Sequence, residues 1–176
     1  MRKYLSYFLI PIAIGIAFVS VFILIFLSQS NDVKFNKVTI PNKFSISIPE
    51  YLLKTDSIDS SALLQYKNEK EQMFLLVYEK LDSANTSLES IFKKKSDDFI
   101  AKIEHGNLEN YYPQKINGID GFIGNIQGSV NETGVYYRIV VMKAGNSFFE
   151  IILGISENMK SSYDEDINQI IQSLSH

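Results

Sequence analysis

Cysteine is absent from this 176-residue sequence, and its absence excludes several kinds of chemistry. Disulfide bonds, thiolate nucleophiles, cysteine-ligated zinc and the lipid-modified cysteine of a lipoprotein all require the thiol group. Histidine is also scarce, because His105 and His176 are the only two. Neither histidine lies in a pattern that indicates a Ser-His-Asp triad, and the sequence has no HExxH motif. We therefore expect no catalytic residues, no metal ligands and no cofactor.

Basic residues are too few and too scattered for a nucleic-acid-binding surface. The chain has 17 Lys and Arg against 20 Asp and Glu, and Arg2 and Lys3 precede the first acidic residue. The rest of the chain therefore has a net charge near −5. Affinity for nucleic acid depends largely on neutralised phosphates, so we expect no nucleic-acid partner. We interpret the short run Lys93–Lys95 as a solvated helix face rather than a contact with anionic lipid.

The longest apolar run, Phe8–Leu27, has no charged residue. As a helix it would be about 30 Å long, the thickness of the hydrocarbon core of a bilayer. Arg2 and Lys3 precede it, which predicts a cytoplasmic N-terminus and a C-terminal domain outside the cytoplasm. A cleaved signal peptide is the alternative, although its apolar region is usually shorter. We expect residues 1–30 to be a single-pass anchor in the cell membrane and residues 31–176 to be an extracytoplasmic domain.

Strand patterns dominate this domain. Phe44–Ile48 alternates apolar residues with serine, which is typical of a half-buried strand, whereas Met73–Tyr78 is apolar on both faces. In the second half, short turn sequences separate three long apolar segments, and short connections make neighbouring strands antiparallel. Asn107–Ile116 is expected to be irregular. The predicted strands are Lys34–Ile40, Phe44–Ile48, Ser60–Tyr66, Met73–Tyr78, Gly121–Ser129, Gly134–Lys143 and Ser147–Ile155.

Two helices are predicted from capping signals and from apolar residues at helical spacing. The first begins at the capping box Thr86–Glu89, and we expect it to end left-handed at Gly106, with His105 at its C-terminus. Lys95 falls within its apolar stripe, so we expect its ammonium group to reach out to solvent. The second helix begins at the capping box Ser162–Glu165. Together these elements predict an α+β fold, with a mostly antiparallel sheet of six to eight strands flanked by helices.

The order of these motifs resembles the PsbP-like domains. Phe44–Pro49, then Leu64–Asn68 and a long helix, resemble the first half of such a domain. Asn117–Gly121, the three-stranded meander and Ile170–Leu174 are similar to the second half, so the resemblance covers Lys34–Ser175. It implies an α/β/α sandwich around an antiparallel sheet, as in photosystem II extrinsic proteins and DcrB-type periplasmic lipoproteins. It also implies a non-catalytic binding or assembly module, and no functional residues are carried over.

Among the side chains, the pair Tyr111–Tyr112 is our candidate for a partner surface. Tyrosines in an irregular loop can form such a surface, because each combines an apolar ring with a hydrogen-bonding hydroxyl. Tyr136–Tyr137 lies in a predicted strand, and we expect it in the core. The glycines between Gly118 and Gly128 precede strands rather than a helix, so they do not predict a phosphate-binding loop. Adjacent acids such as Asp97–Asp98 point to different sides of a helix and do not converge.

Two classes of function remain open on the sequence. The first is a non-enzymatic, membrane-anchored binding or assembly module. Its N-terminal helix would contact the lipid bilayer, and its partner would be another envelope protein or a small ligand. The alternative is a small hydrolase or transferase with a carboxylate-based site formed only in the fold. Converging acids and bases with perturbed pKa values would favour the enzyme. A weaker hypothesis is a sensor that transmits ligand binding to a partner in the membrane.

Overall fold

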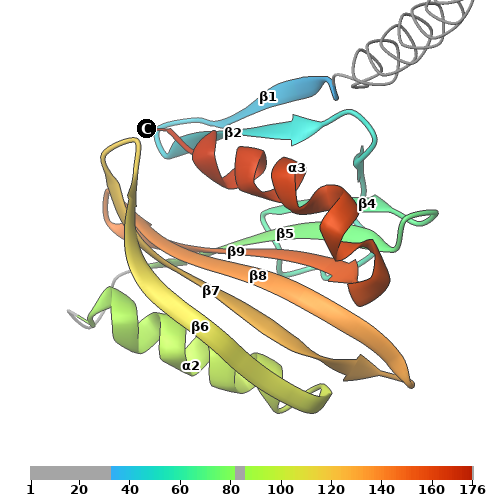
Figure 1. Cartoon of the computed structure of the whole chain (residues 1–176). Coiled ribbons are helices and arrows are strands. Elements are labelled where there is room, and N and C mark those ends of the chain that lie inside the picture. The colour runs from blue at the N-terminus through green and yellow to red at the C-terminus, as the bar shows by residue number, and fades with distance from the viewer. Residues whose placement is uncertain (1–32, 82–85, 176) are drawn as a thin grey trace, which may run out of the picture. The chain divides into compact units, whose positions relative to one another are not determined.

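The structure is a computed structural model that describes residues 33–81 and 86–175 (Figure 1). These described residues form a seven-stranded antiparallel sheet, a separate two-stranded hairpin and two α-helices, so the predicted α+β class is confirmed. The predicted anchor, Phe8–Leu27, lies outside the described residues. Across residues 33–81 and 86–175, neither helix has the length and apolar character needed to cross a bilayer.

Antiparallel pairing builds the large sheet in the order β3-β4-β5-β9-β8-β7-β6. The predicted meander is confirmed as β7, β8 and β9, and β9 also pairs with β5, which joins the two halves of the chain in one sheet. Asn131 and Glu132 connect β7 to β8 with φ angles of 49° and 65°, the left-handed geometry that favours a tight hairpin. The strands are β3 (Leu53–Lys54), β4 (Leu64–Asn68), β5 (Met73–Leu81), β6 (Glu104–Ile116), β7 (Ile119–Val130), β8 (Thr133–Ala144) and β9 (Ser147–Ser156).

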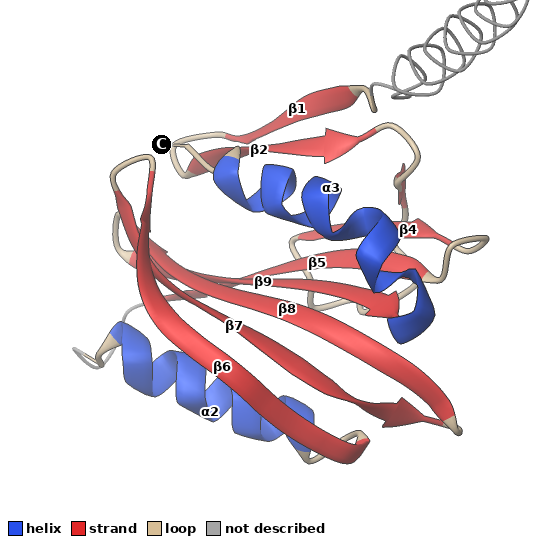
Figure 2. Ribbon diagram, viewed as in Figure 1, coloured by secondary structure: helices blue, strands red, loops and turns tan. Residues whose placement is uncertain are grey.

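Different elements cover the two faces of this sheet (Figure 2). Helix α2 (Leu88–Ile100) packs on one face. Helix α3 (Lys160–Gln172) and the hairpin of β1 (Phe35–Ile40) and β2 (Phe44–Pro49) cover the other face. Because both faces are covered, the central strands must be apolar on both sides, as their sequences indicate.

Two separate cores result from this layering. Successive residues of a strand point to opposite faces, so Tyr136 of β8 lies in the core beneath α3, and Tyr137 lies in the core beneath α2. Their exposed fractions are 0% and 7%, which confirms that this tyrosine pair is packed in the interior. The same alternation in β9 directs Ile151 toward α3 and Ile152 toward α2.

Helix α2 lies close to the sheet because a glycine of β7 lies beneath it. A Cβ atom at Gly124 would be 2.5 Å from Cζ of Phe92, whose side chain is completely buried. The helix starts one residue later than predicted, since Ser87 is the N-cap and its Oγ accepts a hydrogen bond from the backbone N–H of Ser90 at 3.2 Å.

The segment after α2 differs from the prediction. Asn107–Ile116 is not irregular but forms most of β6, which pairs with β7 through two register shifts. Helix α2 ends at Ile100, so His105 and Gly106 belong to the strand rather than to the end of a helix. His105, and not Gly106, has the positive φ angle, 53°. Glycine is required at position 106 for space, because a Cβ there would be 2.7 Å from Cγ1 of Ile103.

Two other element boundaries differ from the prediction. The chain enters α3 through a 3₁₀ turn, Glu157–Met159, so the predicted capping box beginning at Ser162 lies inside the helix. Strand β4 begins at Leu64 rather than Ser60, because Asp59 and Ser61 form a turn in which the Ser61 N–H donates to Asp59 Oδ1 at 2.9 Å. For this helix the apolar spacing predicts a buried stripe of Tyr163, Ile167, Ile170, Ile171 and Leu174. The three isoleucines and Leu174, which follows the end of α3, are buried, whereas Tyr163 is only partly buried.

Candidate functional site

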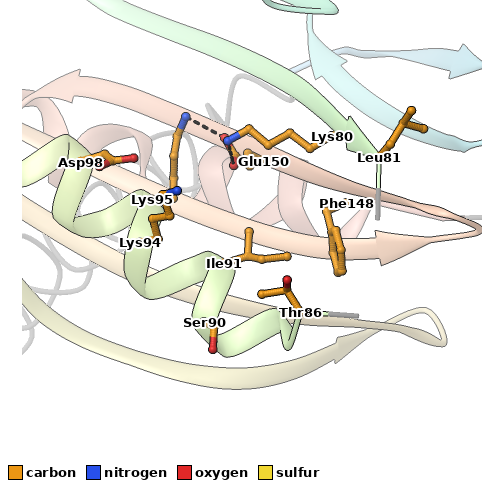
Figure 3. Close-up of a pocket in the computed structure, with 10 residues that line it drawn as sticks. All are labelled: Lys80, Leu81, Thr86, Ser90, Ile91, Lys94, Lys95, Asp98, Phe148 and Glu150. Carbon is orange, nitrogen blue, oxygen red and sulfur yellow. Dashed lines mark ion pairs between the residues drawn. The ribbon is translucent and has the colours of Figure 1, made fainter. Parts of the chain in front are cut away.

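A pocket of about 380 Å³ lies between α2 and the ends of β5 and β9 (Figure 3). Its apolar lining includes Ile91 of α2 and Phe148 of β9. Its charged lining comes from all three elements, so the pocket exists only once α2 has packed on the sheet. The charged residues are Lys80, Lys94, Lys95, Asp98 and Glu150.

Glu150 is the central charge of this pocket. Its side chain is only 1% exposed, and it lies on β9 directly opposite Tyr78 of β5. Lys80 Nζ is 2.7 Å from Glu150 Oε1, and Lys95 Nζ is 2.7 Å from Glu150 Oε2. Within the described part of the chain, neither carboxylate oxygen accepts a well-aligned hydrogen bond, so the buried charge is stabilised by the two ion pairs. We call Lys80, Lys95 and Glu150 the Glu150 cluster.

The sequence predicts that the ammonium group of Lys95 reaches out to solvent, but the structure shows that it does not. Its side chain is 17% exposed, and its ammonium group turns inward to Glu150. The same group lies 4.5 Å from the centre of the Tyr78 ring, a cation–π distance. The Tyr78 hydroxyl in turn donates a hydrogen bond to Asp59 Oδ2 at 2.9 Å. The interpretation of Lys93–Lys95 as a solvated face is therefore wrong for its third residue.

Two ionisable groups next to the Glu150 cluster, Tyr78 and Asp59, have pKa values that move further from neutral pH. Burial raises the pKa of the Tyr78 hydroxyl, and the hydrogen bond to Asp59 raises it further. Hydrogen bonds from Ser61, and a smaller contribution from Tyr78, lower the pKa of Asp59. At neutral pH the phenol therefore keeps its proton and the carboxylate binds one only weakly, so neither is matched to general acid–base chemistry.

Acidification is expected to reduce the stability of the domain through Asp59. Its pKa in the folded state lies below its ordinary value of 3.8, so the unfolded chain binds a proton more readily. The stabilisation is complete above that ordinary value and is lost as the pH falls through the lower folded-state pKa. Chemical denaturation between pH 2 and pH 6 should therefore show a smaller loss of unfolding free energy in acid for Asp59→Asn than for the unmodified chain. Equal losses in both proteins would contradict the role of Asp59.

The candidate pair Tyr111–Tyr112 lies in β6, where its two side chains point to opposite faces of the sheet. The Tyr111 ring stacks on Phe92 beneath α2, with 5.5 Å between ring centres, and its hydroxyl donates to Glu89 Oε1 at 3.3 Å. Tyr112 is 46% exposed and pairs across the strands with Ile123, which belongs to the core on the α3 side. The structure therefore does not bring the two rings together on one surface, and a partner contact at either ring stays a prediction.

A second polar network lies on the α3 side, around Arg138 of β8. The guanidinium group is 8% exposed and donates to the Tyr136 hydroxyl at 2.9 and 3.2 Å and to Asn168 Oδ1 at 2.9 Å. It also pairs with Asp164 at 3.3 Å, and the Tyr136 hydroxyl donates to Asn125 at 2.9 Å. Burial raises the pKa of Tyr136, so its phenol stays protonated. This network connects α3 to the sheet and leaves no activated nucleophile.

Sequence reasoning did not identify Glu150 as a functional residue. The available signal was a pair of exceptions, namely one acid within the apolar strand Ser147–Ile155 and one lysine within the apolar stripe of α2. A buried charge requires an opposite charge nearby, so these two exceptions could have been matched to each other. Among residues 33–81 and 86–175, no group of three or more His, Cys, Asp or Glu side chains is arranged to hold a metal ion.

The layers, the strand order and the position of the two helices define a PsbP-like fold, as the order of motifs predicts. No family model matches the chain, and no curated protein matches it in sequence. The fold assignment therefore rests on similarity to solved structures. Because the sequence identities are low, this similarity shows a shared fold and not a shared function.

Three of these solved structures illustrate the similarity. The cyanobacterial PsbP of Synechocystis sp. PCC 6803 superimposes with a TM-score of 0.62 at 11% identity, covering 83% of this chain and 94% of that protein. The Ran-binding protein Mog1p of Saccharomyces cerevisiae gives 0.57 at 8% identity, covering 81% and 95%. LpqN of Mycobacterium tuberculosis, which is involved in cell envelope biogenesis, gives 0.52 at 10% identity, covering 84% and 92%.

Proposed function

We propose that this chain is a membrane-anchored, extracytoplasmic binding or assembly module without enzymatic activity. The PsbP-like fold supports a binding role, since the proteins that share it include a Ran-binding protein and a protein of cell envelope biogenesis. The observation that carries the proposal is the arrangement of ionisable groups in the pocket beneath α2. Both oxygens of the buried Glu150 carboxylate are held by lysine ammonium groups, so this carboxylate stabilises the wall of the pocket and is not available as a free base.

A hydrolase or transferase would need a carboxylate that faces its reactant. Asp98 is the pocket carboxylate that has no ion pair among the described residues, so it is the residue on which the alternative depends. Ester and phosphoester hydrolysis by the full chain can be measured with chromogenic substrates. A turnover that Asp98→Asn abolishes while thermal unfolding stays unchanged would contradict the non-enzymatic proposal.

The anchoring and orientation rest on the apolar run Phe8–Leu27 and the positive charges ahead of it. Because the chain has no cysteine, single cysteines can report its orientation without background. Lys54→Cys, at an exposed position of β3, should react with a membrane-impermeant maleimide in intact cells. Tyr4→Cys, ahead of the apolar run, should react only after the cells are permeabilised. The opposite pattern would contradict the proposed orientation.

The partner surface predicted at Tyr111–Tyr112 can be tested one residue at a time. Tyr112→Ala should leave the unfolding free energy within about 0.5 kcal/mol and should reduce the recovery of proteins crosslinked to the full chain in intact cells. Tyr111→Ala should lower the unfolding free energy by about 1 kcal/mol, because it removes the stacking on Phe92. Unchanged crosslinking with both variants would remove this strand from the candidate partner surfaces.

A further inference from the structure

The pocket beneath α2 contains more positive than negative charge. Three lysines and two acids line it, and the Glu150 cluster itself places two ammonium groups against one carboxylate. Lys94 makes no ion pair among the described residues, and the side chain of Lys80 is 58% exposed. Among the residues that the structure describes, one positive charge of this lining is therefore not matched by a negative charge, and a bound anion could neutralise it.

Apolar side chains lie beside this charge. Ile91 and Phe148 line the pocket together with Leu81, which is 73% exposed. Figure 3 shows Ile91 and Phe148 next to the charged side chains rather than in a separate hollow. A ligand that fills the pocket would therefore contact cationic groups at one end and apolar carbon at the other.

We propose that this pocket binds a small amphipathic anion, namely a phosphate or carboxylate group attached to a short alkyl chain. The anionic group lies between Lys80 and Lys94, and the alkyl chain covers Ile91 and Phe148. The negative charge of Glu150 keeps an anion out of the buried end of the pocket. Glu150 also holds the ammonium group of Lys95, so the positive charge available to a ligand is that of Lys80 and Lys94 at the mouth. This inference rests on the proposed function, since it specifies the ligand class of a binding module.

Hexyl phosphate is a suitable probe, because it combines both features and partitions weakly into lipid. The full chain is placed in phosphatidylcholine nanodiscs, and binding is measured by calorimetry against empty nanodiscs. For a ligand of this size we expect a Kd on the order of 10–100 μM. Methyl phosphate and hexyltrimethylammonium should each bind at least about tenfold more weakly, because the first lacks the apolar chain and the second reverses the charge.

Two neighbouring lysines of α2 provide a matched pair of variants. Lys94→Glu reverses a charge that lines the pocket, and it should raise the Kd of hexyl phosphate by about tenfold or more. Lys93→Glu removes an exposed pair with Glu89 outside the pocket lining, and it should change the Kd by less than about threefold. Thermal unfolding verifies that both variants are folded.

The outcomes distinguish this inference from the proposed function. Equal effects of the two variants, or equal binding of hexyl phosphate and hexyltrimethylammonium, would overturn the anion site. Binding to phosphatidylglycerol vesicles without binding of free hexyl phosphate would overturn it too, because the surface would then recognise a membrane. A chain that binds no hexyl phosphate but still crosslinks to a protein partner in intact cells would retain the proposed function and lose only this site.

Discussion

Lys95→Met is expected to lower the free energy of unfolding by about 3 kcal/mol. The substitution leaves Glu150, which is 1% exposed, with Lys80 as its remaining cation, and the side chain of Lys80 is more than half exposed. A buried carboxylate with insufficient compensation is costly, because its charge has lost its contact with water. Chemical denaturation of the full chain at neutral pH measures the loss, and Lys93→Met, at an exposed position of the same helix, should cost less than about 0.5 kcal/mol.

The double variant Lys95→Met, Glu150→Leu separates the cost of an unpaired charge from the loss of packing. It removes the carboxylate together with its inner partner, so most of the stability lost in Lys95→Met should return. Lys80 can then extend into solvent. If the double variant is as unstable as Lys95→Met alone, the ion pairs do not explain the stability of this region.

Phe92→Ala is expected to lower the free energy of unfolding by about 4 kcal/mol. The side chain is completely buried beneath α2, where its ring lies 5.5 Å from that of Tyr111 and 6.2 Å from that of Phe122. Its removal leaves a cavity directly above Gly124. Val130→Ala, at an exposed position of β7, should by comparison cost about 0.5 kcal/mol or less.

The close contact between Phe92 and Gly124 predicts that substitutions at these positions are coupled. Gly124→Ala alone should cost about 2 kcal/mol, because its Cβ would be 2.5 Å from Cζ of Phe92. In the Phe92→Ala background the same Cβ enters the cavity, so the loss for the double variant should be at least 1 kcal/mol smaller than the sum of the single losses. Additive losses would show that α2 does not pack as closely on β7 as the structure indicates.

Local sequence patterns predicted the elements whose side chains alternate clearly or whose turns are short. Strands β7, β8 and β9 are joined by short turns, and their order in the sheet follows from those turns. Strand β6 is joined to β7 by the short turn Asn117–Gly118, but its side chains show no clear alternation, because it lies at the edge of the sheet and most of its residues are exposed. Its structure comes from pairing with β7, so Tyr111–Tyr112 could be identified as a candidate but not placed on its two faces.

The pocket beneath α2 could be predicted only in part, for a related reason. The periodicity of α2 placed Lys95 in the buried stripe, but the register of β5 against β9 determines which side chain it meets. That register puts Glu150 opposite Tyr78 and brings Lys80 to the same face. A pattern within one segment carries no information about this pairing, so the expected snorkelling of Lys95 was the natural but incorrect prediction.

Photocrosslinking in intact cells tests most directly the claim that the domain acts by binding a ligand beneath α2. A photoreactive amino acid replaces Leu81, which lines the pocket and is 73% exposed, or Leu53, which lies on β3 and is 68% exposed. We predict that intact-protein mass spectrometry detects a discrete small-molecule adduct after irradiation at position 81 and none at position 53. No adduct at position 81, or the same adduct at both positions, would contradict the claim.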